Sequence, residues 1–259
     1  MSREENQIPD TGRMYNYLKT AFEKLDNNYD KIPDAEYRTE EALSGAHQSL
    51  RRADKDNWRL VLDPYIIINL SGKRDLASGH GQVRLGGNIV VEEGEYKMFS
   101  SSLIIAVQHQ SAKDEPLPDS ISHCCIDSGI TEADRADDPY FHILDRFHWD
   151  IDTGDEKDET KPACHFQVGG EVSNSAFGDW ESYHYCSNGL DKPRFPHPPM
   201  DPVLVFNMLV EQYPQLESFE QHQWDGIVKK GEDALWRKYY SATNGMIGAS
   251  DSIMSLMQP

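Results

Sequence analysis

The sequence lacks the short motifs that mark the common nucleotide-binding and hydrolytic folds. It contains no GxGxxG fingerprint, no P-loop, no GxSxG nucleophile elbow and no HExxH zinc helix. No CxxC pair occurs either, so a zinc ribbon or a thioredoxin-like redox site has no support. We expect the four cysteines to be small core residues of a reduced protein, and they are Cys124, Cys125, Cys164 and Cys186.

Positive charge is also scarce, because 25 Lys and Arg stand against 44 Asp and Glu, for a formal net charge of −19. That balance argues against broad electrostatic capture of nucleic acid or of an anionic membrane, although it leaves room for a small local basic site. The longest apolar runs, residues 65–68 and 103–107, are far shorter than the roughly 20 residues that span a bilayer. The segment after Met1 is polar and lacks the apolar core of a secretory signal. We therefore expect a cytoplasmic protein with no membrane partner.

Helical periodicity marks the two ends of the chain. Apolar side chains recur at 3.6-residue spacing between residues 14 and 25, and a weaker stripe follows Pro33. Near the other end, Asp201 and Pro202 have the types of an N-cap and first-turn pair, and apolar positions recur from there to about residue 240. We expect an N-terminal helical pair within residues 1–57, C-terminal helices over 201–240, and a loose tail over 241–259.

The middle of the chain, residues 58–170, is predicted to form a sheet. Short runs of β-branched and aromatic residues follow one another with no helical stretch between them, which is typical of an antiparallel meander. Residues 88–93, 102–110 and 120–127 are among the expected strands, and the glycine-rich residues 71–87 are expected to form a loop. We predict a single α+β domain over residues 1–240, with a central antiparallel sheet of about five or six strands.

One predicted hairpin carries chemistry. Residues 141–152 alternate between apolar odd positions and mostly polar even positions, and residues 163–169 repeat the alternation after an acidic turn. Burial of both apolar sets fixes the register of the pair and gathers the polar side chains on one face, where direct neighbours lie about 5 Å apart. The even-numbered polar residues of the first strand include His142, and those expected to converge are Arg146, His148, Asp150, His165 and Gln167.

This cluster supports two chemistries and one inert alternative. In metal-free phosphodiester cleavage, His148 and His165 would be acid and base, Asp150 would orient one ring, and Arg146 would stabilise an anionic transition state. That reaction needs no cofactor. Alternatively, His148, Asp150 and His165 form a two-histidine, one-carboxylate set suited to a divalent metal such as Zn²⁺, Mn²⁺ or Fe²⁺. The inert alternative is a polar sheet face whose histidines make ordinary hydrogen bonds.

A long, proline-rich loop is expected over residues 171–200, just before the C-terminal helices. It places Arg194 and His197 near a helix N-terminus, where free N–H groups and a guanidinium can hold an anion together. We assign Gln167, Arg194 and His197 to substrate binding. A stiff connector whose prolines stop the sheet from extending is the alternative.

The order of these motifs resembles a bacterial family. Arg-Phe-His-Trp-Asp, then Lys-Pro-Ala-Cys-His-Phe-Gln-Val-Gly-Gly, then Pro-Arg-Phe-Pro and a helix, is similar to TumE-like toxins and to related uncharacterised proteins encoded near mobile elements and defence genes. The resemblance covers about residues 140–215 and implies a sheet-based toxin or nuclease-like module. Its matching positions are Arg146, His148, Asp150, Pro162, His165, Gln167, Arg194 and Pro196.

Together, the cluster and the resemblance predict a toxin- or defence-associated hydrolase, a nuclease-like phosphodiesterase with nucleic acid as substrate. The strong acidity of the chain fits poorly with a free-standing ribonuclease. The alternative is therefore a non-catalytic subunit or adaptor of a bacterial defence assembly, whose acidic surface contacts a basic protein partner.

Overall fold

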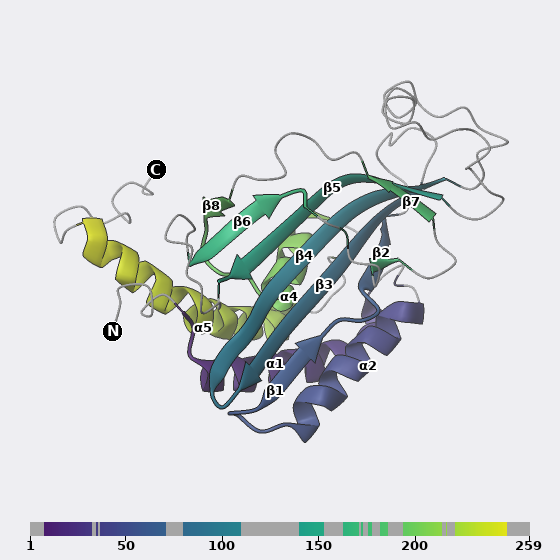
Figure 1. Ribbon diagram of the computed structural model, residues 1–259. Helices are drawn as coiled ribbons and strands as arrows, with labels where there is room; N and C mark the ends of the chain where they lie inside the picture. The colour runs from purple at the N-terminus through teal and green to yellow at the C-terminus, as the bar shows by residue number, and fades with distance from the viewer. Residues whose placement is uncertain are drawn as a thin grey trace.

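A computed structural model describes residues 8–32, 35, 37–70, 80–109, 140–152, 163–170, 172, 176–177, 182–185, 194–213, 216 and 221–247. Two helices open the chain, a sheet follows, and two more helices come last (Figure 1). The α+β class, the N-terminal helical pair and the C-terminal helices are confirmed. The strand expected over residues 120–127 lies outside the described residues, as do Cys124, Cys125 and Cys186. Cys164 is a buried free thiol, as expected.

The N-terminal pair consists of α1 (Thr11–Asn27) and α2 (Tyr37–Arg52), with a single 3₁₀ turn, η2 (Tyr29–Lys31), between them. α1 begins where the side chain of Asp10 accepts a 2.8 Å hydrogen bond from the backbone N–H of Arg13, which satisfies one of the free donors of the first turn. The apolar stripe of α1 is buried along the helix, from Met14 to Leu25, as the periodicity predicts.

Eight strands form one sheet within the described residues. The strands that pair antiparallel in the order β1-β3-β4-β5-β6-β8 are β1 (Trp58–Val61), β3 (His80–Glu92), β4 (Glu95–His109), β5 (Tyr140–Ile151), β6 (Cys164–Val168) and β8 (Arg194–Pro196). β2 (Ile66–Leu70) pairs antiparallel with β3, and β7 (Ser182–Tyr185) joins β5 in parallel. The extra strands over the expected number are β7 and β8, which lie in the region predicted as a long loop.

The glycine-rich segment is a second departure from expectation, because β3 begins at His80 and takes in Gly81, Gly86 and Gly87. Two of these glycines are needed for close packing. A Cβ at Gly86 would lie 2.2 Å from the ring of Tyr65, and a Cβ at Gly87 would lie 2.3 Å from the ring of Pro202. Glycine in this strand therefore admits a neighbour on each face of the sheet rather than marking a loop.

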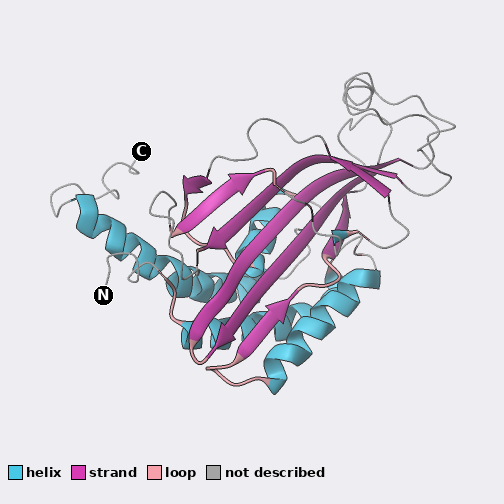
Figure 2. Cartoon of the chain, in the orientation of Figure 1, coloured by secondary structure: helices cyan, strands magenta, loops and turns pink. Residues whose placement is uncertain are grey.

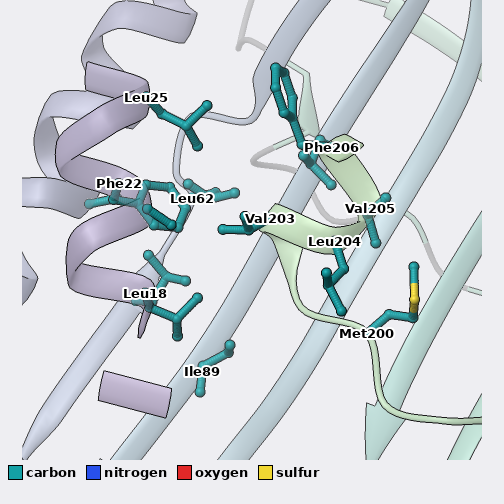
Figure 3. Packing of buried hydrophobic residues seen from close by; sticks show 14 of the residues in the cluster. Leu18, Phe22, Leu25, Leu62, Ile89, Met200, Val203, Leu204, Val205 and Phe206 are labelled. Atoms are coloured by element: carbon teal, nitrogen blue, oxygen red, sulfur yellow. The ribbon is translucent and has the colours of Figure 1, made fainter. Parts of the chain in front are cut away.

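The helices lie behind and beside the sheet and cover one of its faces (Figure 2). α4 (Pro202–Gln212) is apolar on nearly all sides and packs against β3 and β4, beside α1, as Figure 3 shows for Val203, Val205 and Phe206. α5 (Gln221–Ile247) packs on α1 and α4 and continues beyond the expected end at residue 240. One hydrophobic cluster contains buried side chains from all four helices and from the sheet.

The opposite face of the sheet, here called the distal face, carries a smaller cluster. Arg84 is fully buried there, with its guanidinium 4.3 Å from the ring of Phe141 and 4.1 Å from that of Phe177. Its Nη1 donates a 2.6 Å hydrogen bond to the carbonyl of Ala176. Residues 176–177 thus cover one part of the distal face, and the polar cluster lies further along the same face.

A β-bulge divides β5 into two stretches with opposite facing. The register between β4 and β5 shifts between Ile105 and Ala106. Phe141 and Ile143 therefore pack in the distal cluster, whereas Trp149 and Ile151 pack beneath the helices. The prediction of one unbroken alternation over residues 141–152 was wrong. The bulge adds one residue to β5, so the side chains on its two sides follow opposite odd–even patterns.

Candidate functional site

The predicted hairpin exists, and its register places the polar side chains in two rows on the distal face. β5 and β6 pair antiparallel, with His148 opposite Gln167 and Asp150 opposite His165. On the other side of β5, Ser102 pairs with His148 and Ser100 pairs with Asp150. Directly paired side chains share a face and lie about 5 Å apart. His142 pairs with Val107 beyond the bulge and has the opposite facing, so it does not join the rows.

Three atoms of this cluster converge. Nε2 of His148 lies 3.0 Å from Oδ2 of Asp150, and Nε2 of His165 lies 3.6 Å from the same oxygen. His148, Asp150 and His165 each offer a ligand atom within 4.8 Å of the others, so the group could hold a metal ion. Donor atoms bound to one tetrahedral ion at ~2.0–2.1 Å lie about 3.4 Å from one another, and the two separations from Oδ2 of Asp150, 3.0 and 3.6 Å, lie on either side of that value.

His165 is held without hydrogen-bond partners in the described part of the chain. Its side chain is only 6% exposed, and neither ring nitrogen has a hydrogen-bond partner there. The 3.6 Å separation between its Nε2 and Oδ2 of Asp150 is too long for a hydrogen bond. A buried imidazole normally has at least one partner, so the position of this ring points to a ligand at Nε2.

Arg146 fixes the other nitrogen of His148. Its Nη1 lies 2.7 Å from Nδ1 of His148 and donates to the carbonyl of Gly169 as well. A guanidinium is only a donor, so Nδ1 of His148 must accept. The hydrogen of this imidazole then lies on Nε2 and points to Asp150. In this arrangement His148 is neutral, between a cation and a carboxylate.

The electrostatics of Asp150 follow from its neighbours. Burial raises the pKa of its carboxyl, but the surrounding side chains of His148, His165 and Ser100, with the hydrogen bond from His148 first, outweigh burial and hold that pKa well below its usual range. The Asp150 side chain is 27% exposed, whereas His148, His165 and Gln167 are buried. Asp150 therefore stays ionised at neutral pH and is more accessible than His148 or His165.

Two glycines that were not among the predicted site residues border the site. Gly169 and Gly170 follow β6 with positive φ angles of 85° and 87°. A Cβ at Gly170 would lie 2.8 Å from Nη1 of Arg146 and 3.3 Å from Cε1 of His148. The Gly-Gly pair directly after a strand was the available signal, since two left-handed residues allow the backbone to turn back over its own strand.

The structure separates the two residues expected from the proline-rich segment. Arg194 pairs with Gln167 across β6 and β8, so it extends the row of His148 to the exposed edge of the sheet. His197 lies on the other face, with its ring 6.4 Å from that of Trp149 and 5.7 Å from that of Phe166. Its position beneath the helices gives no support to the expected role in substrate binding.

The helix N-terminus expected to bind an anion is already occupied by a side chain. Oδ1 of Asp201, which is fully buried, accepts from the backbone N–H groups of Val203 at 2.6 Å and Leu204 at 3.2 Å. Burial raises the pKa of this carboxyl to about 7. The start of α4 is therefore closed by its own N-cap, and an external anion has no place there.

Comparisons with protein-family models, with curated proteins and with solved structures give no match to this chain. The resemblance to TumE-like toxins accordingly stays a prediction from the motifs. Among the described residues, no helix has the length and the apolar character needed to cross a bilayer.

Proposed function

We propose that the cluster on β5 and β6 is a divalent-metal centre that hydrolyses phosphodiesters. The observation that carries the proposal is the convergence of His148 Nε2, Asp150 Oδ2 and His165 Nε2 within ligand distance of one another. Three protein ligands of this kind leave a coordination position open for water, as in catalytic zinc sites rather than structural ones. An ion held there would supply a polarised water near neutral pH.

The other side chains of the face suit an anionic substrate. Arg146 borders the ligands directly, and Arg194 stands at the exposed edge of the same row as Gln167. Guanidinium groups bind phosphate through paired N–H donors, and Arg146 is placed to stabilise charge that develops beside the ligand set. In a chain of net charge −19, two arginines beside one cluster make a local cationic site. The motif resemblance, which implies a nuclease-like module, leads to the same reaction class.

The metal-free alternative has less support in the geometry. A histidine acid–base pair needs each ring to present a nitrogen to a reacting oxygen. Here both Nε2 atoms point to the same carboxylate oxygen, and the remaining nitrogen of His148 is engaged by Arg146. The arrangement therefore favours His148 and His165 as ligands over His148 and His165 as acid and base.

Metal binding is tested on the full chain purified without chelators. We expect about one equivalent of bound Zn²⁺, Mn²⁺ or Fe²⁺ by elemental analysis, and Co²⁺ absorption bands typical of a nitrogen and oxygen site. His165→Gln should lower metal affinity more than 100-fold, since outer-shell partners alone contribute 10–100-fold. His197→Gln is the matched control, because that ring lies on the other face, and it should bind metal like the wild type. Equal affinities in the two variants would remove the proposed centre.

Activity is tested with bis-p-nitrophenyl phosphate and with a short single-stranded RNA, with and without added metal. We expect hydrolysis that EDTA abolishes, that metal restores, and that His165→Gln loses. Activity that survives EDTA yet disappears in His148→Ala would favour the metal-free mechanism instead. A metal-loaded wild type that cleaves neither phosphodiester would overturn the hydrolase proposal while leaving the metal site in place.

A further inference from the structure

The hydrogen bond between Arg146 and His148 conflicts with metal binding. Because Nη1 of Arg146 donates to Nδ1 of His148, the imidazole must carry its hydrogen on Nε2. Yet Nε2 lies 3.0 Å from Oδ2 of Asp150, so it is the nitrogen of His148 that would bind the proposed ion. An ion can bind only a nitrogen with a free lone pair, so the hydrogen of His148 has to move to Nδ1 when the ion enters.

That movement would place two donors face to face. With hydrogen on Nδ1, the N–H of His148 would point at the N–H of Arg146 across 2.7 Å. A metal-ligating histidine instead gives its second N–H to a carboxylate, a backbone carbonyl or water. Arg146 must therefore leave Nδ1 before the ion is held, and its side chain is only half-buried.

We propose that Arg146 is a latch that couples metal binding to anion binding. In the ion-free protein, Arg146 holds His148 in the tautomer that cannot ligate. When an ion binds, Arg146 releases His148, and its guanidinium becomes a donor for an anionic group beside the ion. This inference rests on the proposed metal centre and adds to it a role for Arg146 in setting its affinity and in selecting a phosphate-bearing substrate.

Two consequences follow. Removing Arg146 should strengthen metal binding. Removing an ordinary outer-shell residue, which supports a ligand, would instead weaken metal binding. An anion that pairs with the released guanidinium should also strengthen metal binding, and by linkage the metal should strengthen anion binding by the same factor. The coupling should disappear when the guanidinium is absent.

The first experiment titrates Co²⁺ into the wild type, Arg146→Met and Arg194→Met, with the visible absorption bands as the readout. We expect about tenfold tighter binding in Arg146→Met, by analogy with the 10–100-fold effects of outer-shell partners. Arg194→Met removes a cation from the same row without touching His148, so it controls for simple charge and should bind like the wild type. Equal or weaker binding in Arg146→Met would overturn the latch.

The second experiment needs no substitution, so it holds even if Arg146→Met fails to fold. Long-range ¹⁵N–¹H spectra of the full chain report which ring nitrogen of each histidine carries hydrogen. The latch requires the Nε2–H tautomer of His148 without metal and the Nδ1–H tautomer with Zn²⁺. An Nδ1–H tautomer in the ion-free protein would overturn it.

The third experiment repeats the Co²⁺ titration with dimethyl phosphate, an inert phosphodiester anion. We expect tighter Co²⁺ binding in the wild type and no change in Arg146→Met. If the wild type binds Co²⁺ but dimethyl phosphate has no effect, the coupling is wrong and the metal centre stands. If neither protein binds Co²⁺, the proposed metal centre fails together with the latch.

Discussion

Tyr17 and Asp201, 184 residues apart in sequence, share a buried hydrogen bond of 3.3 Å from the hydroxyl of Tyr17 to Oδ1 of Asp201. The bond joins α1 to the first residue before α4, at the centre of the helical layer. Burial is the largest cause that raises the pKa of Asp201 to about 7, against hydrogen bonds from Leu204, Val203 and Tyr17 that lower it. The fold therefore contains a carboxyl whose ionisation opposes folding near neutral pH.

The pH dependence of stability follows from this carboxyl. The folded protein keeps a proton on Asp201 that the unfolded chain releases near pH 4, so its stabilising contribution falls as pH rises from about 4 through about 7. Asp201→Asn keeps the capping oxygen and removes the titration. We expect its urea-unfolding free energy to exceed that of the wild type by about 1–4 kcal/mol at pH 8, and by less at pH 5.

Asp10→Asn is the matched control, because it makes the same change at the N-cap of α1 and leaves Asp201 in place. Its stability should fall with pH as that of the wild type does. If Asp201→Asn shows the same fall as the wild type, another group is responsible and the proposed role of Asp201 is wrong.

Gly86 tests the close packing beside the site, on the distal face. A Cβ at this position would meet the Tyr65 ring at 2.2 Å, and the hydroxyl oxygen of Tyr65 accepts a 3.0 Å hydrogen bond from Oγ of Ser102, which pairs with His148. Gly86→Ala should therefore destabilise the protein by about 1–3 kcal/mol in chemical denaturation. Gly45→Ala, in α2 with nothing within 4 Å, should stabilise it by up to ~1 kcal/mol. Equal effects of the two changes would contradict the packing described.

Arg84 should tolerate no conservative replacement. Its Nε and Nη2 both donate to Oε1 of Gln82, at 3.0 and 2.7 Å, while the guanidinium contacts the rings of both Phe141 and Phe177. Lysine keeps the charge but has neither the planar group nor the fork of donors, so Arg84→Lys should lose about 2–3 kcal/mol of stability. The exposed Arg59→Lys should change the unfolding free energy by less than ~0.5 kcal/mol.

Sequence patterns predicted most of the architecture because it rests on local periodicity. The stripe of α1, the N-cap Asp201 and the β5–β6 hairpin each depend on side chains close together in sequence. The hairpin alone brings His148, Asp150 and His165 to one face, so the centre of the site was predictable. Residues that gather through strand pairing over longer distances, such as Ser102 and Tyr65, left no comparable signal.

The errors have physical causes too. The alternation of residues 141–152 breaks once, at apolar Leu144 and polar Asp145, and the prediction passed over that break, which is where the register with β4 shifts. The glycines of β3 were predicted as a loop because close packing against Tyr65 and Pro202 is a tertiary effect. His197 lies in a proline-rich segment. Because proline fixes φ, the regular alternation of a strand cannot be assumed there, and the sequence does not indicate which face of the sheet His197 occupies.

Alanine substitutions at Gly170 and at Gly94 distinguish backbone strain from crowding at the site. Gly170 and Gly94 both have positive φ, at 87° and 76°, so an alanine at either position pays for the left-handed conformation. At Gly94 the nearest atom to a new Cβ is Oδ1 of Asp56 at 3.9 Å, whereas at Gly170 it is Nη1 of Arg146 at 2.8 Å. Gly94→Ala should therefore lose about 1–2 kcal/mol of stability and leave Co²⁺ affinity unchanged.

Gly170→Ala should lose at least as much stability and should also alter Co²⁺ affinity, because the methyl group displaces Arg146 from Nδ1 of His148. If Arg146 opposes the ion, as proposed, the displacement makes Co²⁺ binding tighter even though the protein is less stable. A supporting role for Arg146 gives weaker binding from the same change. The direction of that one shift, measured against Gly94→Ala, therefore distinguishes the two roles of Arg146 without removing its charge.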